Sequence, residues 1–136
     1  MEMIIQNIIV DGYERFVEVN TMDSKKLIVH FIEYSEFLND NEKTKLKKIG
    51  DVLNTDICID LVSNSYITND ELCFVQEIEN SSSIKAVIEV NEVVDEYTVL
   101  AKTSLCEEAI LIEFESKMEY QQHDRVYIEG SLEVDE

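Results

Sequence analysis

The last third of the chain alternates apolar and polar residues with a period of two. Four segments show the pattern: 84–94, 97–102, 109–115 and 125–135. In the last of them Val126, Ile128 and Leu132 are even-numbered, and most residues between them are polar or aromatic. This alternation is typical of an antiparallel sheet that buries one face and exposes the other. Gly130 falls on the buried parity, which predicts a bend or a close approach of two backbones there.

Two apolar runs near the N-terminus cover residues 3–10 and 13–20 and are separated by Asp11-Gly12. An Asp-Gly pair between such runs predicts a β-hairpin with a type I′ turn, because both central residues of that turn need positive φ. A third strand is predicted over 26–34. Its apolar residues fall on both parities, which indicates a strand covered on both faces.

One short helix is predicted, within the region 36–50. Asp40 or Asn41 can cap its start, and Gly50 occupies the position where a left-handed terminating residue is expected. Lysines crowd its later turns, at positions 43, 45, 47 and 48, where positive charge suits the end of a helix dipole.

After the helix region the period returns to two, and strands are predicted over 56–62 and 71–78. In the first of these the predicted inward face is formed by Ile57, Ile59 and Leu61, and the outward face by Asp56 and Asp60.

The pattern as a whole predicts one domain over residues 1–136. It divides into a β-meander at 1–35, the helix region at 36–50 and a β-rich, barrel-like part at 51–136. The fold class is therefore mainly β: an antiparallel sheet, or a small closed or partly open barrel, with one short helix.

The run 84–134 resembles an OB-type barrel in outline. A long first strand at 84–94 is followed by a hairpin partner at 97–102, a third strand at 109–115 and a closing strand with the sequence DRVYIEGSLEV. The resemblance implies a ligand-binding barrel face that carries aromatic and basic residues. The exposed parity here carries mainly Glu, with Lys85 and Arg125 as its few cations, so a nucleic-acid role is not expected.

Acidic residues dominate the composition: 30 Asp and Glu stand against 11 Lys and Arg in 136 residues, for a formal charge of −19. Nucleic-acid binding depends on cations that neutralise phosphates, and adsorption to anionic membranes depends on basic patches. Neither partner is therefore expected. The charge favours solubility and rapid encounter with a cationic partner.

The three cysteines, Cys58, Cys73 and Cys106, are too few and too widely spaced for a disulfide framework. Each has apolar neighbours, which predicts small buried hydrophobes in a protein of the reducing cytoplasm. The N-terminal segment carries Glu2 where a signal peptide requires positive charge, so neither a signal peptide nor a membrane span is expected.

No motif for a metal, a cofactor or a catalytic nucleophile is evident. His30 and His123 lie far apart, no Cys or His pair has the spacing of metal ligands, and three glycines form no phosphate-binding loop. We therefore expect no cofactor, no metal site and no enzymatic activity. The alternative is a hydrolase that uses the pair Asp56 and Asp60 with His30.

The candidate partner-binding site is an acidic face of the sheet. Glu113 and Glu115 lie on one predicted strand, Glu129 and Glu133 on another, and the two strands are expected to be near neighbours. Like charges on neighbouring strands destabilise a sheet, and a cationic partner would remove this cost. Tyr127 lies on the same face of its strand, and tyrosine is one of the residue types that anchor protein interfaces. The complete candidate set is Glu89, Glu113, Glu115, Tyr127, Glu129 and Glu133.

These features predict a small acidic protein-binding module. In size, acidity and lack of catalytic motifs the chain resembles the small bacterial immunity proteins, which implies an inhibitor that blocks a basic partner such as a toxin nuclease. The alternative is a β-barrel accessory or assembly protein without catalysis, which forms homo-oligomers through an exposed edge. The Ile-rich first strand, at 3–10, is the candidate edge.

Overall fold

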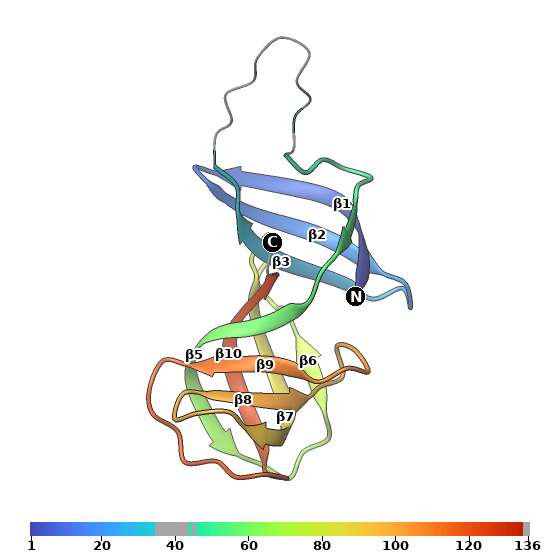
Figure 1. Ribbon diagram of the computed structural model, residues 1–136. Coiled ribbons are helices and arrows are strands. Elements are labelled where there is room, and N and C mark those ends of the chain that lie inside the picture. Colours follow the sequence, from blue (N-terminus) through green and yellow to red (C-terminus); the bar gives the residue numbers. More distant parts are fainter. Residues whose placement is uncertain (35–43, 45, 135–136) are drawn as a thin grey trace.

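The computed structural model describes residues 1–34, 44 and 46–134, and its strands form one continuous sheet (Figure 1). The strands are β1 (Glu2–Asp11), β2 (Glu14–Thr21), β3 (Lys26–Ile32), β4 (Val52–Asn54), β5 (Ile57–Ile67), β6 (Cys73–Val75), β7 (Ser83–Val93), β8 (Thr98–Lys102), β9 (Ile110–Phe114) and β10 (Arg125–Val134). Their order in the sheet is β4-β1-β2-β3-β10-β5-β9-β8-β7-β6.

Five of these strands close into a barrel, seen in the lower half of Figure 1. β7, β8 and β9 are antiparallel neighbours in chain order, and β10 pairs with β7 to complete the ring. β5 lies between β9 and β10, parallel to the first and antiparallel to the second. The expected β-barrel is thus confirmed, and four of its strands come from the run 84–134.

A smaller sheet of β1 to β4 extends from the barrel. The backbones of β3 and β10 pair at a single parallel position, Glu133 with His30. The first strand was expected to be an exposed edge, and this is wrong for its first residues. β4 pairs with Glu2–Ile4, and the Ile5 N–H donates to the Asp51 carbonyl, because the chain returns along β1 after Gly50.

The predicted hairpin between β1 and β2 is present, but its turn lies one residue later than expected. Asp11 pairs with Glu14, so the loop is Gly12-Tyr13. Gly12 has a φ of +60° and Tyr13 is not among the residues of positive φ. This is the arrangement of a type II′ turn rather than type I′, because glycine takes the one position that needs positive φ.

The predicted helix falls largely on residues 35–43 and 45, which lie outside the described residues. The described part of the segment, Leu46–Gly50, forms a bend and a turn and not a helix. Gly50 has a φ of +92°, and its N–H donates to the Ile5 carbonyl. Within the described ranges there is no helix of the length and apolar character needed to cross a membrane.

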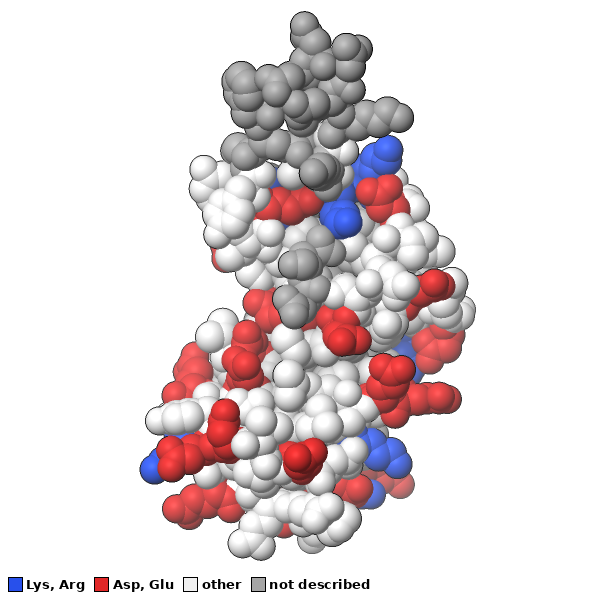
Figure 2. All heavy atoms as spheres, in the orientation of Figure 1, with Lys and Arg blue, Asp and Glu red and all other residues white. Residues whose placement is uncertain are grey.

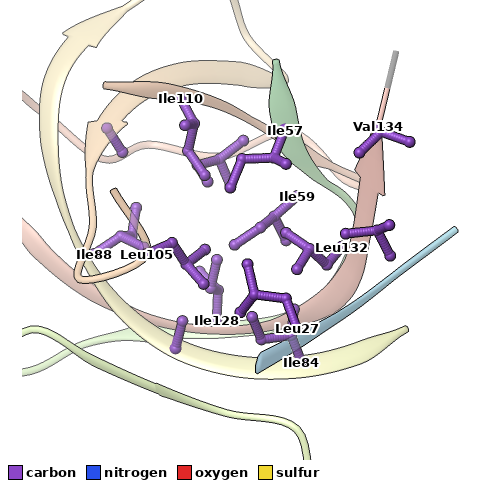
Figure 3. Packing of buried hydrophobic residues seen from close by; sticks show 14 of the residues in the cluster. Leu27, Ile57, Ile59, Ile84, Ile88, Leu105, Ile110, Ile128, Leu132 and Val134 are labelled. Atoms are coloured by element: carbon purple, nitrogen blue, oxygen red, sulfur yellow. The ribbon is translucent and has the colours of Figure 1, made fainter. Parts of the chain in front are cut away.

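The core is continuous from the smaller sheet into the barrel. Leu27 of β3 is fully buried and lies with Ile59, Ile84 and Leu132 of the barrel (Figure 3). The opposite face of β3 is covered only in part, since Ile28 and His30 are half-buried and Ile32 is exposed, so the prediction of a strand covered on both faces fails only at its end. β2 follows β3 in the sheet, and only one of its two faces is fully buried in the core.

Two polar side chains fasten the smaller sheet to the barrel. Lys25 Nζ donates to the carbonyls of Ser104 and Leu105, at 2.8 and 3.3 Å. The Gln76 side chain accepts from the Ile28 N–H at 2.8 Å and donates to the Ile28 carbonyl at 2.7 Å. Gln76 therefore satisfies backbone groups at the β3 edge that β10 leaves unpaired.

Candidate functional site

A cleft of about 790 Å³ lies where β3 meets the outer side of the barrel. Five carboxylates line it: Asp56, Asp60, Glu108, Glu113 and Glu133. His30 is also present, and no Lys or Arg side chain is among the lining residues. Carboxyl groups therefore outnumber the cationic groups at the cleft, where Met1 also lies and its α-amino group acts on Cys106.

His30 is held between two carboxylates. Its Nδ1 lies 2.8 and 2.9 Å from the two carboxylate oxygens of Glu133. Its Nε2 lies 3.3 Å from Oε1 of Glu14, but without hydrogen-bond geometry, and this buried nitrogen has no hydrogen-bond partner. The ring also packs on Phe16, with 5.0 Å between ring centroids. The imidazole is thus fixed at the only backbone pairing between β3 and β10.

Glu133 is a largely buried carboxyl group of the cleft. Its side chain is 19% exposed, and burial raises its pKa despite the hydrogen bond from His30. Asp60, whose charge lies nearby, acts in the same direction. A carboxyl group that resists ionisation in an anionic cleft is poised to respond to an approaching cation.

Asp60 and Glu113 form a close acidic pair across β5 and β9. Their carboxyl groups are near enough to share a hydrogen bond, and this bond and the Asp60 charge raise the pKa of Glu113. Ile59 of β5 pairs with Ile112 of β9, so the next residue on each strand points outward beside the other. Two like charges are thereby placed side by side on the cleft surface.

The cleft also has apolar lining residues: Met1, Phe31, Ile32, Ile57, Leu100, Ala109, Ile110, Leu111 and Val134. Cys58 and Cys106 also line it. None of the three cysteines is fully buried, and Cys73 is exposed, so their expected role as core hydrophobes is not confirmed. Burial raises the pKa of the Cys106 thiol, although the hydrogen bond to the Glu108 carbonyl acts in the opposite direction, and the raised pKa opposes nucleophilic activation.

The structure brings only part of the predicted acidic face together. β9 and β10 were expected to be near neighbours, and this is wrong because β5 lies between them. Glu113 and Glu133 line the cleft from the two sides of β5. Glu115, one residue beyond β9, is exposed and does not line the cleft.

The other members of the predicted set already have partners on the barrel surface. Glu89 Oε1 accepts from Arg125 Nε at 3.3 Å. Glu129 accepts from Asn64 at 2.8 Å and from the Tyr127 hydroxyl at 3.1 Å, and these bonds lower its pKa. On the face drawn in Figure 2, acidic side chains spread over the barrel rather than gathering in one patch.

Tyr127 stacks on Tyr66 of β5, with 4.7 Å between ring centroids and 23° between the ring planes. The two residues face each other in the β5–β10 register. Burial, followed by the hydrogen bond to Glu129, raises the pKa of Tyr127. The aromatic residue of the predicted site is thus part of a fixed pair on the barrel surface.

Sequence reasoning named the central cleft residues but assigned them differently. Asp56, Asp60 and His30 were the residues of the hydrolase alternative, and the cleft contains all three. Glu108 was missed as a lining residue, and Glu14 as a contact of His30. The signal that identified Asp60 was its outward position in the alternating segment 56–62. No sequence pattern indicated that β5 lies between β9 and β10.

Within the described residues, no three His, Cys, Asp or Glu side chains are arranged to hold a metal ion. The fold and the cleft define a class: a β protein in which a closed five-stranded barrel continues into a smaller sheet, with an acidic cleft at the junction. Comparisons of this chain with protein families, curated proteins and solved structures give no match.

Proposed function

We propose that the protein is a non-catalytic binding module of the inhibitor type, whose cleft takes a basic side chain of a protein partner. One observation carries the proposal: five carboxylates and no Lys or Arg side chain line the cleft. Asp60 and Glu113 lie close enough to repel each other when both are ionised. A guanidinium or ammonium group between them would replace this repulsion by attraction.

The shape of the cleft suits a long basic side chain better than a bare ion. Its carboxylates stand among aliphatic residues such as Ile57, Leu111 and Val134. Lys and Arg lay their methylene stems on apolar surface while the charged head makes polar contacts. A planar guanidinium can also form paired hydrogen bonds with carboxylates.

The whole-chain charge supports a basic macromolecule as the source of that side chain. A formal charge of −19 steers a cationic protein toward this one and speeds their encounter. The likeness in size and charge to immunity proteins adds the inhibitory role, in which docking blocks a basic functional surface. In this form of the proposal the partner inserts a residue into the cleft.

A second candidate is acid–base catalysis in the same cleft, and Glu133 is the observation that favours it. This carboxyl is largely buried, has a raised pKa and is hydrogen-bonded to His30, as catalytic acids often are. Among the cleft-lining residues, no Lys or Arg is available to stabilise negative charge developing on a substrate. Cation binding is therefore the function we prefer.

We propose also that the barrel is OB-like, with one strand displaced in chain order. β7, β8, β9 and β10 correspond to the four strands of the resemblance at 84–134, and β5 supplies a fifth strand from earlier in the chain. The ligand expected for such a barrel changes with its surface. An acidic cleft suits a basic protein and not a polyanion.

The binding proposal is tested with a short Arg-rich peptide and the same peptide in which citrulline replaces Arg. Affinity is measured by calorimetry for the wild type and for a cleft variant, Asp60→Asn with Glu113→Gln. The matched control, Glu79→Gln with Glu92→Gln, loses the same charge at exposed positions outside the cleft. Nα-acetyl-arginine amide, used as a separate ligand, distinguishes a free small molecule from a protein segment.

The Arg peptide is expected to bind about tenfold more weakly to the cleft variant than to the wild type, since tenfold corresponds to about 1.4 kcal/mol. The control variant should lose much less, and the citrulline peptide should not bind. Equal losses in the two variants would reduce the effect to overall charge and refute the cleft. Turnover of chromogenic glycosides, esters or phosphates that disappears in Glu133→Gln would favour catalysis instead.

A further inference from the structure

Leu61 of β5 is unfavourable to the fold on two counts. Its φ is +55°, a left-handed conformation that costs a residue with a side chain about 1–2 kcal/mol. Its side chain is also 59% exposed, although the alternation of the strand predicted it in the core. A strained backbone that holds an apolar side chain in solvent is a feature of binding sites.

A bulge in β5 produces this orientation. The pairing with β10 shifts register between Glu129 and Ser131, and the residue opposite the shift is Gly130. Val62 takes the buried position that the alternation gives to Leu61. Asp60 faces the cleft through the regular alternation of β5, and the bulge that follows it turns Leu61 toward a second depression on the barrel.

That depression is a groove of about 490 Å³ between residues of β5, β6, β7 and β10, in which apolar side chains stand among serines and charged groups. Leu61, Val75 and Ile78 line it and are all substantially exposed. The charged groups at its rim already have partners: Lys85 Nζ lies 3.0 Å from Glu77, and Glu129 is bonded to Asn64 and Tyr127. The exposed apolar side chains of the groove therefore remain available for contact with a partner.

The groove and the acidic cleft are adjacent along β10. Ser131 lines the groove and Glu133 lines the cleft, and both side chains leave the same side of the strand. Residues two apart on a strand are separated by about 7 Å. This is also the spacing of side chains two positions apart in an extended peptide laid along the strand.

We infer that the cleft and the groove form one binding surface for an extended segment of a basic protein, in which a basic residue and an aliphatic residue two positions apart enter the cleft and the groove. Leu61 is its apolar anchor. The inference rests on the proposed function and names the chemistry of the partner segment. Charge complementarity specifies the basic residue, because carboxylates line the cleft, and the apolar lining of the groove specifies the aliphatic one.

The test compares two peptides of identical composition in titrations followed by NMR. One carries Arg-Ser-Leu and the other Arg-Leu-Ser, so that only the first presents Arg and Leu on the same side of an extended chain. Each is titrated into the wild type, Leu61→Asn, the control Val93→Asn and the cleft variant Asp60→Asn with Glu113→Gln. Asn tolerates the left-handed conformation, so Leu61→Asn removes the side chain without adding strain.

The spaced peptide is expected to bind the wild type about tenfold more tightly than the adjacent one, which is the scale of a single interface anchor. Leu61→Asn should abolish this preference, while its thermal midpoint stays at or above that of the wild type; Val93→Asn should retain the preference. The inference is wrong if residue order has no effect, if Leu61→Asn keeps the preference, or if that variant loses thermal stability. Binding that ignores the cleft variant refutes the proposed function, whereas binding that depends on the cleft but not on Leu61 refutes only this inference.

Discussion

Gly130 of β10 lies so close to Asp60 of β5 that a Cβ atom placed on the glycine would stand 2.7 Å from the Asp60 carbonyl oxygen. The same atom would stand 2.9 Å from Cγ2 of Ile59 and 3.1 Å from Cγ2 of Val62. A backbone carbonyl cannot rotate aside as a flexible side chain can. The glycine therefore permits the two strands to approach at the bulge, where Asp60 and Leu61 take different directions.

Gly130→Ala is expected to destabilise the protein by about 1–3 kcal/mol, the usual cost of an extra methyl group in a filled site. The strands must separate to admit the Cβ, so affinity for the Arg peptide should also fall as Asp60 moves. Urea denaturation followed by circular dichroism measures the first effect. Ser63→Ala, an exposed position on β5, should change the free energy of unfolding by no more than about 0.5 kcal/mol. A Gly130→Ala variant as stable as Ser63→Ala would contradict the steric argument.

Much of the barrel was predictable because its signal is local. The period of two over 84–94 and 125–135 gave strands that match β7 and β10 to within a residue or two. The close approach of two backbones at Gly130 was also predictable, since a glycine at a buried strand position often marks a bend or such an approach. The strand β4 was not predicted, because its three residues are too few to show an alternation.

Features that depend on distant contacts were not predictable. The exposure of Leu61 arises from a register shift against a strand much later in the chain, and the alternation of 56–62 alone placed it inside. The grouping of the candidate site residues depends on distant contacts in the same way. Glu113 and Glu129 seemed to share a face, but the insertion of β5 between their strands depends on which strands pair, and strand period carries no such information.

The contact between His30 and Glu133 should make a measurable contribution to stability. His30→Ala removes the closer of the two hydrogen-bond partners of a largely buried carboxyl group, His30 and Ser131, which costs about 1–3 kcal/mol. A double-mutant cycle of His30→Ala and Glu133→Gln, measured by urea denaturation, should give a coupling free energy of about 0.5–3 kcal/mol. The same cycle with Glu92→Gln, at an exposed position of β7, should give a value near zero. Equal couplings in the two cycles would show that His30 acts through general packing.

The acidic pair predicts that mild acid stabilises the folded chain. Hydrogen bonding with Asp60 and the Asp60 charge raise the pKa of Glu113 above its ordinary value of 4.5, and burial raises the pKa of Glu133 in the same direction. The folded state therefore binds these protons more tightly than the unfolded state does. Their contribution to stability is present below the ordinary pKa and is lost as pH rises through the raised values.

The urea midpoint should accordingly rise as pH falls from about 7.5 to about 5, and Glu113→Gln should flatten this rise. Glu92→Gln removes one charge at an exposed position and controls for the reduced repulsion of the whole acidic chain. At still lower pH the trend should reverse, because the pKa values of Glu129 and Asp23 are lowered by hydrogen bonds that their protonation would weaken. An identical pH profile in Glu113→Gln and Glu92→Gln would exclude the acidic pair as the cause.

The stacked rings of Tyr66 and Tyr127 join β5 to β10 on the outer surface of the barrel. Aromatic pairs contribute about 0.5–1.5 kcal/mol beyond the area that they bury, so Tyr66→Leu, which keeps an apolar side chain, should lower the free energy of unfolding by this amount. Tyr97→Leu is the matched control, because Tyr97 has similar exposure and no ring contact among the described residues. Removal of the Tyr66 ring should also make the Tyr127 hydroxyl titrate at lower pH, because burial is the main cause of its raised pKa, the stacked Tyr66 ring covers part of Tyr127, and the Tyr66 charge makes a smaller contribution. Ultraviolet titration of the tyrosines measures that shift. If both the titration and the urea midpoint of unfolding are unchanged in Tyr66→Leu, the two rings are neighbours without energetic coupling.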